Sequence, residues 1–351
     1  MKLRTWILSA VLSAASCLAQ AHDFVVTIGG QKVYFNVKSQ KNKTAEVTYK
    51  GGVATGLPAH YEGELTLPAK VKHDNTVYSI VGIGAKAFCG ADKLTGVVLP
   101  SGISAIGDFA FEGCTALSKI IFPGNEVKFG QGVFFKCDKI QDVSFGSDWK
   151  EVDLKMFRWS DSLQVITIPA KLEKIQNLKS LKHLKSLSVD INNARFAAVD
   201  GLLYNKNCEI LYGCPRAYCG PVRIAAETKT ITAGALADCE EVTGIDLPAN
   251  LTSVSFREFC RLSKLNEIVF RGATPIKTAK CNGTEVFLLQ VANPDVKIVV
   301  LKTAKDAYKS ALRQQPGEYT ETGGTVPFFV EQTQIPNVKN IIGVKNFAKY
   351  E

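Results

Sequence analysis

Large apolar residues recur along the chain at a spacing of 23 residues. Each copy of the pattern opens on one such residue, and six copies open at Phe88, Phe111, Phe134, Phe157, Leu236 and Phe259. In each copy, further apolar residues stand five positions before this opening residue and six, nine and eleven positions after it. Agreement of this kind over six copies indicates an internal repeat.

The repeat predicts a short strand and the position at which that strand ends. Apolar residues nine and eleven positions after the opening residue, such as Val97 and Leu99, alternate as in a strand with one buried face. A proline, which cannot donate to a strand ladder, follows this strand in four copies, and Gly146 and Arg271 replace it in two others. One copy cannot bury its own apolar face, so successive copies must stack. The expected fold is a leucine-rich-repeat solenoid, built from units of about 23 residues that each combine a β-strand with a turn or short helix.

A shorter, leucine-only copy follows Phe157. It fits the pattern if Leu178 takes the opening position, and the period then breaks. Residues 191–226 are expected to be an insert containing a hairpin, with strands at 201–204 and 209–212. The predicted repeat regions are therefore 81–190 and 227–275.

Both ends of the repeat are expected to carry caps that cover exposed strand edges. Residues 22–80 form the predicted β-rich N-terminal cap, with strands at 24–28, 32–37 and 45–49 and a turn at Gly29-Gly30. Residues 276–351 form the predicted α/β C-terminal cap, with a strand at 296–300 and a short helix at about 304–312.

The first 21 residues have the pattern of a secretory signal peptide. Lys2 and Arg4 precede an apolar run at 6–15, and Ala19-Gln20-Ala21 is a small-x-small cleavage site. We expect the mature chain to begin at His22 and to be exported to the cell surface, the periplasm or the medium. Lipoprotein anchoring at Cys17 is a less favoured alternative. No later apolar stretch reaches the length of a membrane helix.

The chain resembles the BspA-like leucine-rich-repeat family of bacterial surface proteins. The resemblance rests on units such as residues 103–117, on Asp200-Gly201-Leu202-Leu203-Tyr204-Asn205-Lys206, and on the closing residues 304–309. It covers nearly all of the expected mature chain. It implies an exported protein, often attached to the surface of Gram-negative anaerobes, with adhesion or protein binding as its role and no catalytic residues.

Composition and charge narrow the possible partners. With 46% hydrophobic and 21% charged residues, the chain is neither disordered, collagen-like nor a multi-span membrane protein. A formal charge of +9 favours acidic surfaces but is too small to indicate nucleic-acid binding.

Ten cysteines, nine of them after Cys17, raise the question of disulfide bonds. An odd number leaves at least one thiol unpaired in an oxidising compartment. Cys114, Cys137 and Cys239 stand three positions after opening residues, where we expect buried free thiols. A strained Cys114–Cys137 disulfide is a less favoured alternative. One disulfide is also possible among Cys208, Cys214 and Cys219.

The sequence gives no reason to expect catalysis, a metal or a cofactor. His22, His60, His73 and His183 are scattered, and no HExxH, GxSxG or phosphate-binding loop is present. A cysteine-dependent hydrolase, with a Cys–His pair formed by folding, is a remote alternative.

Two surfaces are candidate binding sites. The first is the outward strand face, eight and ten positions after each opening residue, whose mixture of β-branched and charged side chains suits an extracellular or host protein better than a sugar ring. It comprises Lys119, Ile121, Asp142, Ser144, Val165, Thr167, Asp246, Glu267 and Val269.

The second surface is a basic one beside Trp159. Trp159 occupies a position that polar residues and glycine hold in other copies, so we expect it to be exposed, whereas Trp149 is expected in the core. Lys179, Lys182 and Lys185 recur every three residues between buried leucines and form a predicted basic ridge. This surface would suit an acidic protein or an anionic glycan, although a solvated edge that only keeps the protein soluble is the simpler interpretation.

Overall fold

The computed structural model describes residues 22–49, 61–259, 261–277, 279–281, 284–286, 291–313, 318–321, 324–327, 336, 338–344 and 347. It divides into two compact units, Met1–Trp149 (unit 1) and Lys150–Glu351 (unit 2). The expected signal peptide with Cys17, and also His60, lie outside the described residues. Within the described part, no helix is long and apolar enough to cross a membrane.

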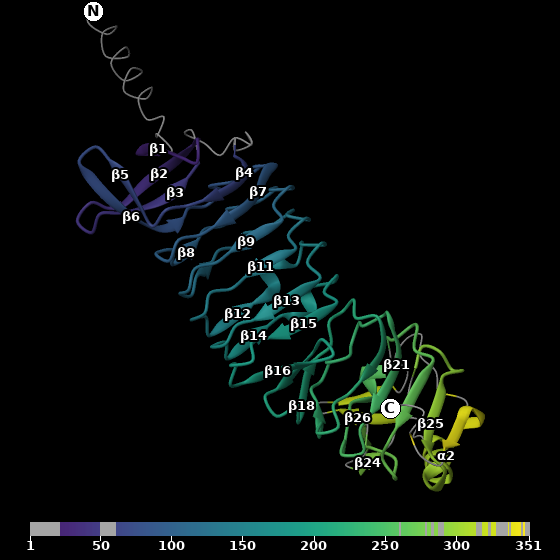
Figure 1. Cartoon of the computed structure of the whole chain (residues 1–351). Coiled ribbons are helices and arrows are strands. Elements are labelled where there is room, and N and C mark those ends of the chain that lie inside the picture. The colour runs from purple at the N-terminus through teal and green to yellow at the C-terminus, as the bar shows by residue number, and fades with distance from the viewer. Residues whose placement is uncertain are drawn as a thin grey trace, which may run out of the picture. The chain divides into compact units, whose positions relative to one another are not determined.

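Unit 1 consists of short strands joined by turns. The strands are β1 (Phe24–Ile28), β2 (Gln31–Ser39), β3 (Thr44–Thr48), β4 (Glu62–Thr66), β5 (Lys70–His73), β6 (Thr76–Ile83), β7 (Lys93–Val98), β8 (Ala105–Ile106), β9 (Lys119–Ile121), β10 (Lys128–Phe129) and β11 (Asp142–Ser144). One sheet has the order β1-β2-β3-β6-β8-β10 with β5 beside β6, and the other has the order β11-β9-β7-β4 (Figure 1).

The repeat in the sequence becomes two parallel ladders in unit 1. Ile106 pairs with Ile83 on one side and Phe129 on the other, each 23 positions away. In the second sheet Ile120 pairs in the same way with Val97 and Val143. Each turn of the chain therefore adds one strand to each ladder.

A stack of aromatic rings fills the space between the two ladders. Phe88, Phe111 and Phe134 are all fully buried. The Phe88 and Phe111 ring centroids are 4.9 Å apart, and those of Phe111 and Phe134 are 5.4 Å apart, in stacked geometry. Trp149 is 2% exposed and its indole Nε1 donates to the Pro123 carbonyl at 3.0 Å, so this side chain belongs to the core as expected.

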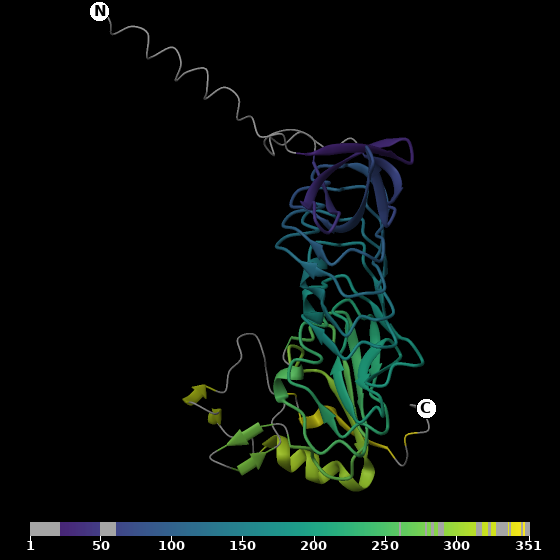
Figure 2. The ribbon, with the colours of Figure 1, turned by 90° about the vertical axis from the view of Figure 1, so that its left-hand side faces the viewer.

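The N-terminal strands lie close to the positions expected from the sequence. β1 and β2 form an antiparallel pair whose turn holds Gly29 and Gly30 at positive φ, and these purple strands lie at one end of unit 1 (Figure 2). β3 pairs in parallel with β6, and β4 pairs in parallel with β7. Strand β4 thus belongs to the same ladder as the repeat strands.

Unit 2 begins with further parallel pairs. β12 (Glu151–Asp153) pairs with β14 (Lys174–Gln176), and β13 (Val165–Ile168) pairs with β15 (Ser186–Val189). Short 3-10 helices hold the opening positions: η1 (Leu154–Phe157), η2 (Leu178–Ser180) and η3 (Phe256–Phe259). Phe157, Leu236 and Phe259 are fully buried, whereas Leu178 is only half-buried.

Residues 196–223 form the expected hairpin and then rejoin the stack. β16 (Phe196–Val199), β17 (Leu202–Asn205) and β18 (Ile210–Gly213) pair antiparallel in that order. β18 then pairs in parallel with β20 (Thr230–Ile231), and β19 (Gly220–Arg223) pairs in parallel with β21 (Val242–Leu247). The second half of this segment therefore continues the ladders of unit 2.

The last ladder extends toward the C-terminus. β21 is followed in the sheet by β22 (Glu267–Phe270), β25 (Lys297–Leu301) and β28 (Ile341–Val344). Helix α2 (Lys305–Arg313), labelled in Figure 1, follows the 3-10 helix η4 (Lys302–Ala304). Its Tyr308 is buried, and the Tyr308 hydroxyl donates to the Thr274 carbonyl at 3.0 Å. The remaining elements are β23 (Ala279–Cys281), β24 (Thr284–Val286), β26 (Glu318–Glu321), β27 (Gly324–Pro327) and η5 (Val338–Asn340).

Candidate functional site

In unit 1 the outward strand face consists of two rows of side chains on β4, β7, β9 and β11. The ladder register sets Glu64, Gly96, Lys119 and Asp142 in one row, and Thr66, Val98, Ile121 and Ser144 in the next. Asp142 and Ser144 are exposed, and Lys119 and Ile121 are half-buried. These four predicted residues therefore lie together on one face.

Gly96 lets two opposite charges approach each other across a strand. A Cβ at position 96 would lie 3.1 Å from Cγ of Glu64, so the Glu64 side chain lies against the glycine. Its carboxylate ends 3.8 Å from the Lys119 ammonium. The charged row thus alternates negative, positive and negative at Glu64, Lys119 and Asp142.

Glu64, Thr66 and Val98 were not among the residues predicted from the sequence. The strand that carries Glu64 and Thr66 falls in the region assigned to the N-terminal cap. A signal for it does exist, because Leu65, Leu67 and Pro68 repeat the pattern of Val97, Leu99 and Pro100. The β5–β6 hairpin that follows lengthens this turn and hides the period.

In unit 2 only some of the predicted residues of the outward strand face are exposed to solvent and without an ion-pair partner on the neighbouring turn. Val165 is 51% exposed, and the exposed Thr167 shares a 2.8 Å hydrogen bond with Ser188. Asp246 binds the Arg271 guanidinium through both oxygens at 2.8 Å, and Glu267 pairs with Lys297.

The expectation that the whole outward strand face is exposed is wrong at Val269. This side chain is 3% exposed and is buried together with Val299 of the neighbouring strand. Directly after the same strand, Arg271 contacts the ring of Phe347, with 5.2 Å between the guanidinium carbon and the ring centroid.

Trp159 is 42% exposed, in agreement with the expectation that it lies at the surface. The Arg158 guanidinium stacks over its ring at 4.8 Å, which adds a cation beside the aromatic surface. Lys182 and Lys185 are exposed, and His183 of the same turn lies 3.4 Å from Asp161 of the turn that carries Trp159. Two of the three predicted lysines are therefore exposed, on the turn next to the one that carries Trp159, and the third is not.

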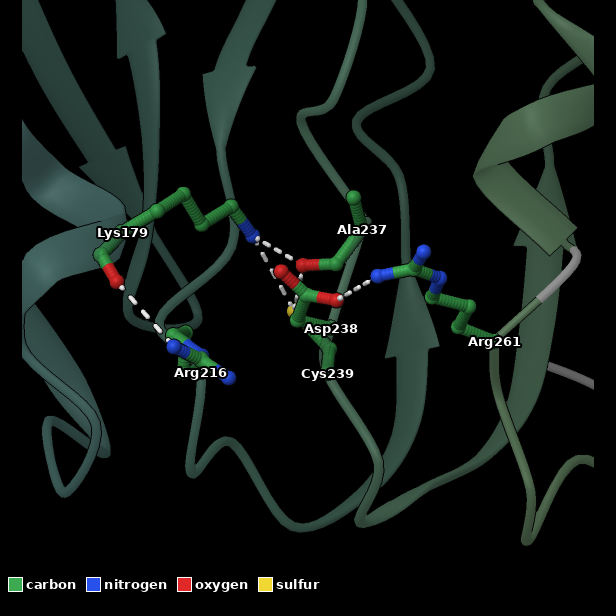
Figure 3. Close-up of polar contacts among 6 residues, drawn as sticks. All are labelled: Lys179, Arg216, Ala237, Asp238, Cys239 and Arg261. Carbon is green, nitrogen blue, oxygen red and sulfur yellow. Dashed lines mark hydrogen bonds and ion pairs between the residues drawn. The ribbon is translucent and has the colours of Figure 1, made fainter.

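Lys179 points inward and is not part of an exposed ridge. Its ammonium donates to the carbonyl oxygens of Cys214 at 2.9 Å, Ala235 at 3.0 Å and Ala237 at 2.8 Å, and it lies 3.3 Å from Sγ of Cys239 (Figure 3). The physical cause is the next turn of the stack. Cys214 donates its N–H to the carbonyl before Leu236, just as Phe88 donates to the carbonyl before Phe111. A small thiol therefore occupies the position of a phenyl ring and leaves room for the lysine stem.

The thiols of Cys214 and Cys239 lie side by side next to this ammonium, and both are fully buried. The Cys214 and Cys239 side chains share a hydrogen bond, which together with the Lys179 charge lowers the pKa of Cys239 to about 7 against the effect of burial. The same hydrogen bond and burial raise the pKa of Cys214. The arrangement thus favours one thiolate and one thiol.

Two further charged groups lie close to these thiols. Asp238 is 3.4 Å from Arg261, as Figure 3 shows. The buried Glu258 carboxylate accepts from the backbone N–H groups of Gly234 at 2.5 Å and Leu236 at 2.7 Å, and burial raises its pKa.

Cys114 and Cys137 are buried free thiols, as the repeat predicts. Each sits over a backbone carbonyl of the previous turn, with Cys114 Sγ 3.2 Å from the Phe88 oxygen and Cys137 Sγ 2.9 Å from the Phe111 oxygen. Cys208, Cys214 and Cys219 also carry free thiols in the structure, so a disulfide among them stays a prediction.

The described residues contain no group of three or more His, Cys, Asp or Glu side chains that could hold a metal ion. A polar hollow of about 470 Å³ lies in unit 1 between β1, β2 and β6, and Asp23, Gln40, His73 and Tyr78 line part of it. The Tyr78 hydroxyl donates to Gln40 there at 3.0 Å, which satisfies both groups within the protein.

Solved structures with a similar fold come from several bacteria. The pneumococcal vaccine antigen PcpA is 17% identical with a TM-score of 0.46, over 83% of this chain and 97% of that one. A leucine-rich-repeat protein from Bacteroides ovatus is 20% identical with a TM-score of 0.44, over 81% of each chain. One from Eubacterium ventriosum is 17% identical with a TM-score of 0.42, over 80% of this chain and 78% of that one. Likenesses at this level carry no inference about function.

Family membership rests on the repeat itself. No curated protein matches the chain. The family model for the BspA type leucine-rich repeat region matches residues 71–196 and 217–286 in six copies, which together are more than half of the chain. The chain therefore belongs to the BspA-type leucine-rich-repeat family.

Proposed function

We propose that the chain is an exported, non-catalytic protein-binding or adhesion module whose partner is an extracellular or host protein. Proteins built from leucine-rich repeats bind other proteins over extended surfaces assembled from successive units. The signal-peptide pattern of residues 1–21 supports export. In this proposal the partner contacts the outward strand face of unit 1.

The observation that carries the proposal is the pairing of two unlike rows on one rigid sheet. The charged row, Glu64, Lys119 and Asp142, would fix the orientation of a partner with complementary charges. The adjacent row of Thr66, Val98, Ile121 and Ser144 would supply apolar contact and hydroxyl groups. A face of this kind suits a protein surface, which also alternates apolar and charged groups.

A binding assay with a matched control tests the face. Purified extracellular-matrix proteins and mucins are immobilised, and binding of the wild type is measured by biolayer interferometry. The double variant Lys119→Glu/Ile121→Asp should bind at least about tenfold more weakly, which corresponds to about 1.4 kcal/mol. The control Lys72→Glu/Val77→Asp makes the same changes on the exposed β5–β6 pair, where Val77 is 48% exposed, and should bind like the wild type. Equal binding by both variants would refute the role of this face.

Export is tested separately. Cells that express the full chain are fractionated, and the N-terminus of the recovered protein is sequenced. Protein in the surface or extracellular fraction that begins at His22 is the expected result, whereas full-length protein retained in the cytoplasm would contradict it.

A second candidate is binding of an anionic glycan at the basic surface of unit 2. The observation in its favour is the exposed Trp159 ring with Arg158 stacked on it, close to Lys182 and Lys185. On a glycan array, Trp159→Ala with Lys182→Ala should abolish binding of sulfated or acidic chains while the strand-face variant retains it. Absence of binding to every glycan would leave only the protein partner.

Catalysis forms no part of the proposal. Cys89 contacts Glu112, Cys239 contacts Lys179 and the Cys214 carbonyl, and Cys114 and Cys137 contact backbone carbonyls. A cysteine-dependent hydrolase would lose activity when its thiols are alkylated, so a hydrolytic activity sensitive to iodoacetamide would overturn this part of the proposal.

A further inference from the structure

The cluster around Lys179 in unit 2 has no role in the proposed binding function. It joins three successive turns of the stack: Lys179 on η2, Cys214 directly after β18, and Cys239 in the turn before β21. Sγ of Cys239 lies 3.6 Å from the carbonyl oxygen of Cys214, so the two cysteines are direct neighbours across adjacent turns. Both side chains are fully buried, while Lys179 is half-buried.

Among the described groups that the Lys179 ammonium contacts, none is a carboxylate. Three of its four acceptors are neutral carbonyls at 2.8–3.0 Å, and the fourth is the Cys239 sulfur at 3.3 Å. A second cation, Arg216, donates to the Lys179 carbonyl at 3.4 Å, as Figure 3 shows. A thiolate at Cys239 would supply negative charge at the one contacting atom that can ionise.

The second thiol is placed to complete a redox pair. Cys214 and Cys239 contact each other across adjacent turns, with Cys239 Sγ 3.6 Å from the Cys214 carbonyl oxygen, their side chains interact, and the Lys179 ammonium lies 3.3 Å from the Cys239 sulfur. This is the arrangement that dithiol redox sites require, with one thiolate activated by a nearby positive charge and a second thiol within reach of it.

We propose that Cys214 and Cys239 are a redox-active dithiol, in which Lys179 stabilises the attacking Cys239 thiolate, and that the pair closes to a disulfide linking two adjacent turns. The co-reactant is an exchangeable disulfide, RSSR. The Cys239 thiolate attacks one sulfur of RSSR, the S–S bond breaks, and RS⁻ leaves. Cys214, after losing its proton, attacks the Cys239 sulfur of the mixed disulfide, and the second RS⁻ leaves. The Cys214 proton ends on one RS⁻, and the proton that Cys239 released to solvent on ionising ends on the other, so the protein loses two electrons and RSSR becomes two RSH.

Burial determines when this exchange takes place. An oxidant the size of a tripeptide disulfide cannot reach sulfurs that are fully covered in the folded protein. The bond therefore forms while the turns of unit 2 close during folding. In the folded, reduced protein the same exchange is expected to be slow.

Cys114 and Cys137 in unit 1 provide an internal control. They are also buried, also on adjacent turns, and their thiols also interact with each other. Cys114 contacts the Phe88 carbonyl and Cys137 contacts the carbonyls of Phe111 and Phe135, and among the described residues no lysine ammonium lies within hydrogen-bond distance of either thiol. The proposal therefore expects these two to stay reduced under conditions that oxidise Cys214 and Cys239.

Refolding of the full chain in glutathione redox buffers tests the proposal. Reduced, unfolded protein is refolded at several ratios of oxidised to reduced glutathione, quenched with acid, alkylated and mapped by mass spectrometry. The expected product carries a Cys214–Cys239 linkage with Cys114 and Cys137 alkylated. A linkage of Cys214 to Cys208 or Cys219, or full alkylation of Cys214 and Cys239 at every ratio, would overturn it.

Variants separate the roles of the three residues. Cys214→Ser should retain glutathione on Cys239, because the resolving thiol is absent. Lys179→Met should reach half-closure at an at least about fivefold lower ratio of oxidised to reduced glutathione, because the ammonium stabilises the reduced thiolate form, whereas Lys182→Met should behave as wild type. Lys179→Arg, which keeps the charge, is the second variant if Lys179→Met fails to fold by circular dichroism. An unchanged midpoint in a folded Lys179 variant would refute the role of the lysine.

Discussion

Phe111 shows what a single repeat position contributes to stability. Its ring lies between those of Phe88 and Phe134 and is fully buried. Phe111→Ala would remove both stacking contacts and leave a cavity that the short turns cannot close. We expect the free energy of unfolding to fall by ~3–5 kcal/mol, measured by chemical denaturation.

The neighbouring residue is the control for this substitution. Glu112 is half-buried, and its carboxylate lies 3.8 Å from the Cys89 thiol. Glu112→Ala should cost less than ~0.5 kcal/mol. Equal losses for both variants would mean that the aromatic stack does not carry the stability of unit 1.

Cys239 should make the stability of the reduced protein depend on pH. Its pKa in the folded protein is lowered to about 7, by the Cys214 hydrogen bond and by Lys179, from an ordinary value of 9.0, while Asp238 acts in the opposite direction. Between these two values the unfolded chain binds a proton that the folded chain has released, so the free energy of unfolding rises with pH. The rise should be at most about 1.4 kcal/mol per pH unit, and it is absent below pH 7.

The measurement is a comparison of thermal unfolding from pH 6 to pH 9 in the presence of reductant. The difference in melting temperature between the wild type and Cys239→Ser should grow as the pH rises through this window. The buried Glu258, whose pKa is raised by burial, is common to both proteins, so its contribution cancels in the difference between them. Parallel curves for the two proteins would contradict a stabilised thiolate.

At the residue scale, the sequence correctly predicts whether a side chain is buried or exposed where the 23-residue period is regular. The prediction is wrong where a neighbouring turn departs from that period. Trp149 and Trp159 occupy a core and a surface position, and each was predicted from its place in the repeat. Lys179 obeys the same period but points inward, because Cys214 replaces a phenyl ring in the next turn. That replacement lies in residues 191–226, where no period is visible, so the sequence alone could not reveal it.

Gly146 shows how closely two turns approach each other at the end of a strand. It takes the place that proline holds in four other copies. A Cβ at this position would lie 1.7 Å from the Pro123 carbonyl oxygen and 2.5 Å from Cα of Gly124, and both atoms belong to the backbone. Gly146→Ala would therefore push β11 away from β9 and should lower the free energy of unfolding by ~1–3 kcal/mol or more.

Gly124 is the matched control for this prediction. The nearest atom to a Cβ there is an Asp148 side-chain oxygen at 4.0 Å, so an alanine has room. Gly124→Ala should leave the free energy of unfolding within ~0.5 kcal/mol of the wild type in the same denaturation assay. Comparable losses at both glycines would show that close backbone approach is not the cause.

At the element scale, strands inside the repeat are predictable because burial alternates along them, whereas additions to the ladder depend on distant segments. The sequence predicted the strands at 24–28 and 201–204, and the structure has β1 at 24–28 and β17 at 202–205. It did not identify β4 as a ladder strand, because the β5–β6 hairpin lengthens that turn. It also did not predict that Phe347 would return to Arg271 and that Val269 would be buried.

Across the whole molecule, ion pairs link adjacent turns in the same register as the ladders. Lys174 pairs with Glu151, Arg261 with Asp238 and Lys264 with Glu241, each over 23 positions. These side chains are largely exposed, so each pair contributes little to stability. Most of the stability therefore comes from buried contacts between neighbouring turns, and a local change should have a local effect.

A closed Cys214–Cys239 disulfide would test this local behaviour directly. A link across about 25 residues should stabilise the protein by ~3–4 kcal/mol, because it restricts the unfolded chain. Since each turn contacts only its neighbours, hydrogen exchange should slow in β18, β20 and β21 of unit 2 and stay unchanged in β7 and β9 of unit 1. The comparison uses oxidised and reduced wild type, with Cys239→Ser as the control that should show no difference. Equal slowing in both units would instead mean that the molecule opens as a single cooperative unit.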